Sequence, residues 1–183
     1  MHWSTANYAP WQEGRLLDGL AELYQRGLVK GIGLSNYGPK RLQWAYKKLA
    51  ERGVPIATLQ VQYSLLSTYP ITKLGLKQIC DDMEIKLIAY SPLCLGILTG
   101  KFSIKGKYPP GIRRFLFGQL IPKVEPLLSC LHNIAASKNK TVAQVALNWC
   151  ICKGTIPIPG AKNTKQAQEN IGALGWHLDS GEV

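Results

Sequence analysis

Polar residues follow four short apolar runs of this 183-residue sequence, where they could bind a ligand. The runs end near Leu34, Gln60, Ser91 and Ile158, and each finishes in polar or glycine-bearing letters: SNYG, QVQYS, SPLCLG and PGAKN. Hydroxyl and amide side chains can both donate and accept hydrogen bonds. Backbone amides at the start of a helix suit a phosphate group. These four junctions are therefore the candidate ligand-binding positions.

The segments between the junctions have helical patterns. Leu16, Leu17, Leu20, Leu23 and Tyr24 fall on one helical face, and Gly27 supplies a left-handed stop after them. Further helices are expected over 39–53, 71–84, 126–137, 142–152 and 165–174. The helix over 71–84 is less regular because of Gly75. We expect 93–123 to be rich in loops, and the closing HLDSGEV to open another helix capped by Asp179 or Ser180.

The alternation of helices and apolar runs predicts the fold class. Strands separated by helices of ten or more residues need crossover connections, which produce a parallel sheet covered by helices. The sequence therefore predicts an α/β protein. In such folds ligands gather at the carboxyl ends of the strands, so the four junctions should form one rim.

Composition limits the other possible functions. The chain is 46% hydrophobic and 18% charged, as in an ordinary globular domain. Its apolar runs are far shorter than the ~20 residues of a membrane-spanning helix, and its first residues lack a secretory signal, so no membrane partner is expected. The net charge of +11 comes from basic residues scattered in twos and threes. Nucleic-acid binding is therefore only a weak alternative.

Two further features carry expectations of their own. The five cysteines are scattered and are expected to be reduced and buried; Cys150 and Cys152 diverge on one helix, and no metal site is expected. The basic stretch 103–114 is either a solvated loop or a flap over an anionic ligand. Its charges are Lys105, Lys107, Arg113 and Arg114.

Four motifs resemble, in order and spacing, the second half of the aldo-keto reductases. They are GLVKGIGLSNYG, LQVQYSLL, LIAYSPLCLGILTGKF and PIPGAKNTKQAQENIGALGW. The resemblance covers nearly the whole chain and implies a partial TIM (β/α)8 barrel: residues 1–183 would form the carboxyl-terminal half of an NADP-dependent oxidoreductase domain, without its amino-terminal half. The letters NWCICKGTIPIPG and GALGW are most similar to the plant chloroplast members that act on pyridoxal.

The resemblance implies NADPH as the cofactor and assigns residues to it. Ser35, Asn36 and Gln60 match the family's contacts to the nicotinamide carboxamide, although Ser and Asn also favour simple capping turns. Tyr90 matches the aromatic ring that stacks on the nicotinamide, and Lys162 is the candidate for the 2′-phosphate. The full set of cofactor-binding residues is Ser35, Asn36, Gln60, Tyr90, Ser91, Pro92, Leu93, Cys94, Leu95, Lys101, Arg113, Gly160, Lys162, Gln166, Glu169 and Asn170.

The family's catalytic residues are mostly absent from the matched positions. Its members pass hydride to a carbonyl carbon while a tyrosine, assisted by an Asp and a Lys, donates a proton and a His orients the carbonyl. Only that His has a counterpart, His2. We therefore expect sequence upstream of Met1, and little activity from the 183 residues alone. His132 and His177 match nothing and are expected to be surface or helix-packing residues.

The resemblance also implies a reaction and a location. The expected function is reduction of pyridoxal to pyridoxine in vitamin B6 metabolism, with a small aldehyde as the binding partner. The expected location is the chloroplast, or otherwise the cytoplasm; the oligomeric state is left unassigned. The alternative is a non-catalytic NADPH-binding or regulatory module of the same fold. A Tyr and a Lys at family spacing upstream would favour the enzyme.

Overall fold

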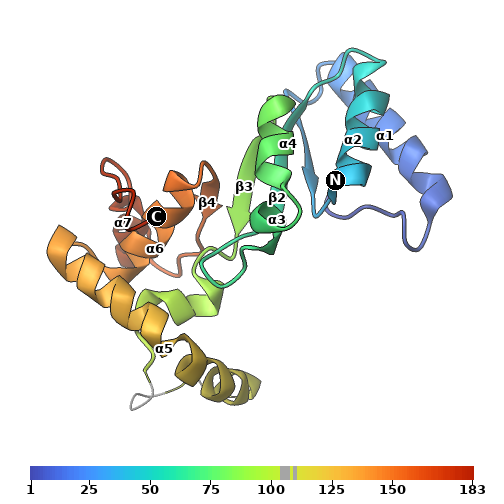
Figure 1. The fold of residues 1–183 in the computed structure, drawn as a ribbon. Helices are drawn as coiled ribbons and strands as arrows, with labels where there is room; N and C mark the ends of the chain where they lie inside the picture. Colours follow the sequence, from blue (N-terminus) through green and yellow to red (C-terminus); the bar gives the residue numbers. More distant parts are fainter. Residues whose placement is uncertain (104–107, 109–110) are drawn as a thin grey trace. The chain divides into compact units, whose positions relative to one another are not determined.

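The computed structural model describes residues 1–103, 108 and 111–183, with only the backbone of 112 and 113. The chain divides into two compact units, each described here by itself (Figure 1). Unit 1 consists of residues 1–63 and 67–90, and unit 2 of residues 64–66 and 91–183.

Unit 1 is built on three parallel strands. They are β1 (Ile32–Ser35), β2 (Ile56–Gln62) and β3 (Lys86–Tyr90), with β2 in the middle. Leu34, Leu59 and Leu87 lie in register across the sheet, and all three are buried. Because successive side chains of a strand point to opposite faces, their neighbours Ser35, Gln60 and Ile88 occupy the other face. One face of the sheet is thus the core, and the other carries the predicted site residues.

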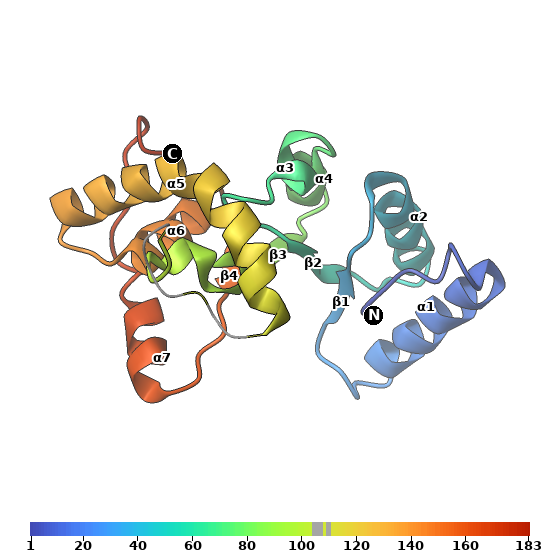
Figure 2. The same cartoon turned by 90° about the horizontal axis from the view of Figure 1, so that it is seen from below.

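Helices connect and cover these strands as the crossover argument predicts. They are α1 (Pro10–Gln25), α2 (Pro39–Ala50), α3 (Tyr69–Thr72) and α4 (Leu76–Asp82). Figure 1 and Figure 2 both show α1 lying beside α2. In α2 the buried residues are Leu42, Ala45 and Leu49, which recur at helical spacing and form the inward stripe.

Unit 2 is organised around one buried helix. Its elements are η1 (Cys94–Thr99), α5 (Ile112–Lys138), α6 (Val142–Cys152), β4 (Ile156–Ile158) and α7 (Thr164–Ile171). Helix α6 packs against η1, α5, β4 and α7, and Figure 2 shows α5 lying along it. Eight consecutive or near-consecutive residues of α6 are buried, so this helix is apolar nearly all round.

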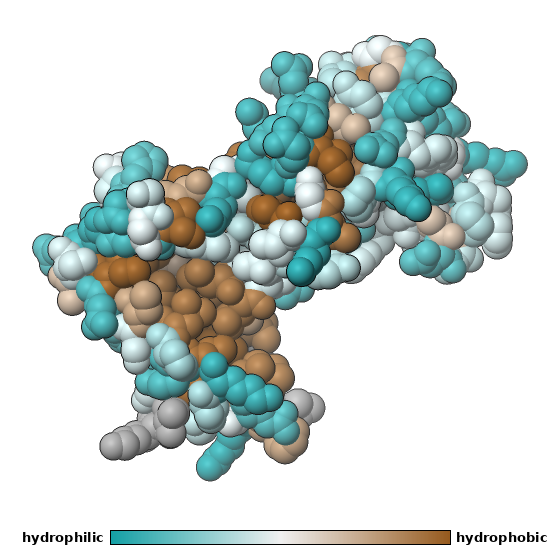
Figure 3. All heavy atoms as spheres, in the orientation of Figure 1, coloured by the Kyte–Doolittle hydropathy of each residue, from teal (hydrophilic) through white to brown (hydrophobic). Residues whose placement is uncertain are grey.

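The surface of unit 2 is partly apolar. Figure 3 shows a broad hydrophobic area over the region of η1 and α5. The exposed large apolar side chains of these two elements include Leu95, Phe115 and Leu116. Among the described residues, no helix combines the length and the hydropathy needed to cross a bilayer.

Two expectations about the elements were wrong. The helix expected over 71–84 is broken into α3 and α4, because Gly75 has a left-handed φ of 63° immediately before α4. The stretch 93–123 is not mainly loop, since it contains η1 and the first turns of α5. By contrast, Asp179 caps the closing turn as expected, because its carboxylate accepts from the backbone N–H groups of Gly181 and Glu182.

Helix α5 is longer than expected because buried contacts outweigh its two internal prolines. Pro122 and Pro126 each remove a backbone donor, and the helix was expected only over 126–137. On the same helix Phe117, Ile121, Leu128 and Leu131 are all buried. Their spacings of four, seven and three place them on one stripe, which keeps the turns before the prolines packed.

Candidate functional site

The ends of β1 and β3 bring three predicted residues together in unit 1. The hydroxyl of Tyr90 donates to Oδ1 of Asn36 at 3.0 Å, and Nδ2 of Asn36 donates to Oγ of Ser35 at 3.0 Å. Asn36 follows β1 directly, and its backbone N–H donates to the carbonyl of Gln60 at 2.8 Å. The three side chains therefore form one hydrogen-bonded chain across the carboxyl ends of the strands.

Asn36 has an unusual backbone. Its φ is 59°, in the left-handed region where asparagine is better tolerated than most other residues. This conformation turns the chain out of the strand and leaves the carboxamide between Ser35 and Tyr90. Local strain of this kind is often found where a side chain must be held in a fixed position at a binding site.

Gln60 lies on the same face of the sheet as these residues. It pairs with Ser35 across β1 and β2, while Gln62, two residues further along β2, pairs with Tyr90. Residues two apart on a strand share a face. The sheet thus places Gln60 beside the Ser35, Asn36 and Tyr90 chain, as the predicted third polar contact requires.

His2 lies close to the same cluster. The backbone nitrogen of Met1 donates to the carbonyl of Gly33 at 2.7 Å, so the first residues run beside β1. Nδ2 of Asn36 lies 3.5 Å from the carbonyl oxygen of His2, and the imidazole is exposed. Within unit 1 the structure therefore brings together His2, Ser35, Asn36, Gln60 and Tyr90.

A buried ion pair in unit 1 was not predicted from the sequence. Glu13 of α1 has no exposed surface, and its carboxylate binds the guanidinium of Arg41 in α2, with the Nε contact at 2.7 Å. Burial favours the protonated acid, but Arg41 outweighs it, so the pKa of Glu13 lies below its usual value. A sequence signal did exist: Glu13 precedes Leu17 by four residues and so falls on the buried stripe of α1.

Tyr37 links this ion pair to the first residues of the chain. It is buried directly after Asn36, and its hydroxyl contacts the sulfur of Met1 at 3.1 Å. Burial first, and then the neighbouring Glu13 carboxylate, raise the pKa of Tyr37, so its hydroxyl stays protonated. The arrangement indicates that Glu13, Arg41 and Tyr37 position the segment that carries His2.

In unit 2 the predicted loop after β3 has a tightly turned backbone. Ser91, Cys94 and Leu95 have φ values of 53°, 46° and 56°. The N–H of Cys94 donates to the carbonyl of Ser91, and the N–H of Gly96 to that of Leu93, both at 2.9 Å. Together with Asn36, these account for four of the six left-handed non-glycine residues that the described part of the chain contains. Strain is therefore concentrated at the predicted site residues.

The predicted adenosine-binding residues lie at the start of α7 in unit 2. Asn163 caps the helix by accepting from the N–H of Gln166 at 3.0 Å, and Gln166 in return accepts from the N–H of Lys162 at 2.8 Å. The Gln166 side chain is thus engaged in a capping interaction. The ammonium group of Lys162 is exposed and has no ion-pair partner among the described residues.

The remaining predicted cofactor-binding residues of unit 2 lie near α7 and η1. Gly160 has open space where a Cβ would stand. Glu169 and Asn170 lie on α7, and the carbonyl of Glu169 accepts from the side chain of Gln144 at 2.9 Å. Lys101 is exposed after η1. Lys105 and Lys107 of the basic stretch 103–114, and the side chain of Arg113, lie outside the described residues.

The cysteines only partly match their expectation. All five are free thiols: Cys80 and Cys150 are buried and Cys94 is half-buried, whereas Cys130 is exposed and Cys152 partly so. Cys130 is exposed because it lies on the outward side of α5, opposite buried Leu131 and Leu128. Among the described residues there is no group of three or more His, Cys, Asp or Glu side chains that could hold a metal ion.

The donors at the strand ends fit a nicotinamide. A primary carboxamide offers one carbonyl acceptor and two N–H donors. Ser35 can donate or accept through its hydroxyl, while Asn36 and Gln60 each offer both an acceptor oxygen and two donors. The half-buried ring of Tyr90 adds an aromatic surface beside them. The donors, acceptors and aromatic ring at the strand ends are thus chemically compatible with a carboxamide carried on a flat ring.

Comparison with known proteins gives a family match along the whole chain. The model of the aldo/keto reductase family matches residues 1–183. The chain is 53% identical over 182 residues to "Pyridoxal reductase, chloroplastic" of Arabidopsis thaliana, covering 100% of this chain and 49% of that protein. It is 28% identical to "Aldo-keto reductase yakc [NADP(+)]" of Schizosaccharomyces pombe, over 92% of this chain and 50% of that protein.

Solved structures confirm the expected fold. The glycerol dehydrogenase of Gluconobacter oxydans superposes with a TM-score of 0.74 at 26% identity, over 91% of this chain and 50% of that one. The α/β class with parallel strands, as part of a (β/α)8 barrel, is therefore confirmed. The chain spans about half the length of the curated relatives it matches.

Proposed function

The chain belongs to the aldo/keto reductase family of oxidoreductases, and on that premise we propose that the protein carrying it reduces pyridoxal to pyridoxine with NADPH. The observation that carries the proposal is the 53% identity with the Arabidopsis thaliana pyridoxal reductase along the entire chain. The cluster of Asn36, Ser35 and Tyr90 supports it, because its donors suit the nicotinamide of the family's cofactor, NADPH.

Each residue of the cluster has a proposed task. When bound, NADPH supplies the hydride, and a proton completes the conversion of the aldehyde to an alcohol. Ser35, Asn36 and Gln60 bind the carboxamide and fix the rotation of the nicotinamide ring. Tyr90 covers one face of that ring, so that only the other face is open to the substrate. His2 orients the carbonyl oxygen by hydrogen bonding.

We further propose that the cofactor is selected through its 2′-phosphate. The ammonium group of Lys162 stands just before α7, where it is exposed and lacks an ion-pair partner among the described residues. A cation next to a helix start favours a dianionic phosphate, which NADH lacks. Lys162 therefore underlies the proposed preference for NADPH over NADH.

The proton donor belongs to the proposal as well. In the family resemblance the donating tyrosine and its Asp and Lys have no counterpart at matching positions of these 183 residues. We therefore expect the 183 residues alone to turn over pyridoxal very slowly. The similarity to a chloroplastic relative favours the chloroplast as the site of action, which a fluorescent fusion imaged in leaf cells would test.

A substrate survey with product identification tests the proposed function. The longest form of the protein that its transcript encodes is purified and given NADPH with pyridoxal, or with other small aldehydes as controls. We expect pyridoxine to form in step with NADPH consumption, and pyridoxal to be the preferred substrate. Preference for an unrelated aldehyde would refute the substrate. NADPH binding without consumption on any aldehyde would favour the non-catalytic module.

A further inference from the structure

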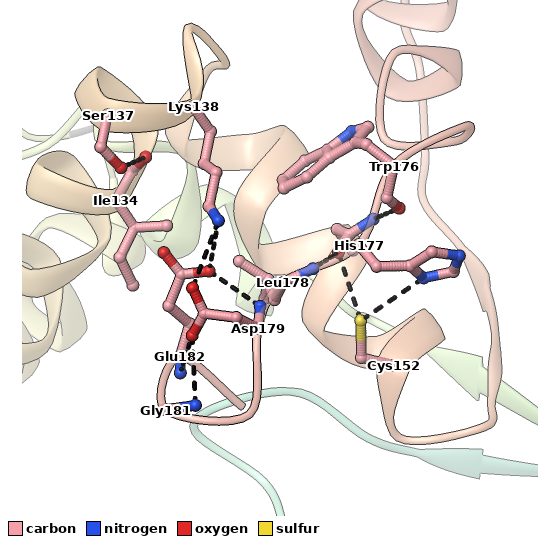
Figure 4. A network of polar contacts seen from close by, with 11 residues as sticks. Ile134, Ser137, Lys138, Cys152, Trp176, His177, Leu178, Asp179, Gly181 and Glu182 are labelled. Atoms are coloured by element: carbon pink, nitrogen blue, oxygen red, sulfur yellow. Dashed lines mark hydrogen bonds and ion pairs between the residues drawn. The ribbon is translucent and has the colours of Figure 1, made fainter.

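A thiol and an imidazole lie near each other in unit 2, in a region that the proposed reductase function does not use. Sγ of Cys152, the last residue of α6, lies 4.0 Å from Nδ1 of His177, which follows α7 (Figure 4). The two residues are 25 positions apart in the sequence. This proximity was not predicted from the sequence. The expectation that His177 lies at the surface is confirmed, because the residue is exposed.

A buried asparagine holds this pair in place. Asn148 has no exposed surface, and its Nδ2 donates to the carbonyls of Ala173 and Trp176 at 2.9 and 2.8 Å. Its Oδ1 accepts from the N–H of Leu178 at 3.0 Å and from the thiol of Cys152 at 3.3 Å. The backbone is thus fixed on both sides of His177, so the imidazole is directed to Cys152 by the fold.

A second set of contacts holds the residues that follow His177. The ammonium group of Lys138 lies 3.4 Å from Asp179 and 3.0 Å from Glu182 (Figure 4). These contacts anchor the segment directly after His177 to the end of α5. Anchors on both sides reduce the entropy that the imidazole must lose to stay near Cys152.

The other thiols lack this combination of access and a nearby base. Burial raises the pKa of Cys80 to about 11 and that of Cys150 to about 12, and it also raises the pKa of Cys94. Cys130 is exposed, but no histidine contact is found for it among the described residues. Cys152 alone of the five is both reachable by solvent and within hydrogen-bonding distance of an imidazole.

We propose that Cys152 is a nucleophilic thiol, with His177 as its base, and that it is a modification site for hydroperoxides. The thiol proton turns about the Cβ–Sγ bond from Oδ1 of Asn148 to Nδ1 of His177, which takes it, and the thiolate attacks one peroxide oxygen. The S–O bond forms as the O–O bond breaks, and the leaving hydroxide, or alkoxide from an organic hydroperoxide, takes the proton from the imidazolium to become water or an alcohol. Sulfur is oxidised to sulfenic acid and the peroxide is reduced. After the thiol has lost its proton, Oδ1 of Asn148 still accepts a hydrogen bond from the N–H of Leu178.

The test measures the oxidation of each cysteine separately. The purified protein, in the longest form that its transcript encodes, is treated with hydrogen peroxide and a sulfenic-acid trap, and each cysteine is quantified by mass spectrometry. We expect Cys152 to be trapped faster than Cys130 although it is less exposed. Because a positioned base accelerates thiolate formation, His177→Gln should slow Cys152 by about tenfold and leave Cys130 unchanged.

Two results would overturn the proposal. One is trapping of Cys130 as fast as that of Cys152 in the unmodified protein, and the other is an unchanged Cys152 rate in a folded His177→Gln variant. The first comparison needs no substitution, so it decides the matter even where the variant folds poorly. Cys152→Ser, which removes the expected adduct, confirms the mass assignment. None of these outcomes depends on the proposed reductase activity.

Discussion

The hydroxyl of Tyr90 donates a 3.0 Å hydrogen bond to Oδ1 of Asn36, which joins the carboxyl ends of β3 and β1 across the central strand β2. The bond fixes which way the Asn36 carboxamide points, because its oxygen is held by Tyr90 and its nitrogen is directed to Ser35. A polar ligand arriving at the strand ends would therefore meet a preorganised set of donors and acceptors.

Removing only the Tyr90 hydroxyl should weaken cofactor binding modestly. Tyr90→Phe keeps the aromatic ring but frees the carboxamide of Asn36, and loss of one such hydrogen bond, about 1 kcal/mol, raises the Kd for NADPH about fivefold. Tyr90→Ala should weaken binding further because the ring is lost too. Fluorescence titration with NADPH measures both. Tyr8→Phe, at an exposed tyrosine, is the matched control, and equal Kd values for Tyr90→Phe and the unmodified protein would contradict the account.

The left-handed backbone of Asn36 predicts an unusual order of stabilities. Asn36→Gly should keep or slightly raise the thermal midpoint, since glycine adopts a φ of 59° without strain. Asn36→Ala loses the same side-chain bonds and also places a Cβ in this region, which costs roughly 1 kcal/mol more. Thermal unfolding of both variants checks this. A less stable glycine variant would mean that the Asn36 hydrogen bonds outweigh the backbone effect.

Lys162 should distinguish NADPH from NADH. Lys162→Met removes the exposed cation before α7, so we expect about tenfold weaker binding of NADPH, on the scale of one charge-assisted contact, and unchanged binding of NADH. Lys165→Met, on the first turn of the same helix and equally exposed, is the control for net charge. Calorimetric titration of both cofactors against the unmodified protein and the two variants gives the six affinities. An equal loss for both cofactors would show that Lys162 does not contact the 2′-phosphate.

The ion pair of Glu13 and Arg41 should stabilise unit 1. Glu13→Gln leaves Arg41 without its partner, and we expect a loss of roughly 3 kcal/mol, the lower end for breaking a buried pair, because the Arg41 side chain is 31% exposed. Chemical denaturation measures the free energy of unfolding. Glu22→Gln, which breaks the exposed pair with Arg26, is the control and should cost less than about 0.5 kcal/mol.

The carboxylate of Glu13 should also make the stability of the protein depend on pH. The pKa of Glu13 in the folded protein lies below its usual value of 4.5. Its contribution to stability is therefore fully present above about pH 4.5 and is lost as the pH falls through the lower folded-state pKa. The stability difference between the unmodified protein and Glu13→Gln should shrink over that acid range. A difference that stayed constant down to the acid transition would contradict this assignment.

Much of unit 1 could be predicted from local patterns. The stripe of Leu42, Ala45 and Leu49 is buried as its spacing requires, and Gly27 has the left-handed φ, 69°, expected of a helix stop. The strand ends brought Ser35, Asn36 and Tyr90 together because parallel strands share an edge. In each case the deciding interaction lies within one element or between neighbouring strands.

Features that depend on contacts distant in the sequence could not be predicted in this way. Helix α5 persists through Pro122 and Pro126 because of its packing against α6, which no local pattern reveals. The approach of His177 to Cys152 requires Asn148 to bind the backbone 25 and 28 residues further on. The position of Glu13 on an apolar stripe indicated that its side chain is buried. Its partner Arg41, however, is 28 residues away on another helix and could not be identified from that stripe.

The most direct test of the account asks whether Asn36 acts on the nicotinamide alone. NADP and 2′-phospho-ADP-ribose, which lacks the nicotinamide, are titrated calorimetrically against the unmodified protein and Asn36→Gly. We predict that NADP binds the unmodified protein more tightly, and that the substitution removes about tenfold of this advantage while the affinity for 2′-phospho-ADP-ribose is unchanged. Equal losses for both ligands, or no loss for either, would show that the cluster at the ends of β1 and β3 does not hold the nicotinamide.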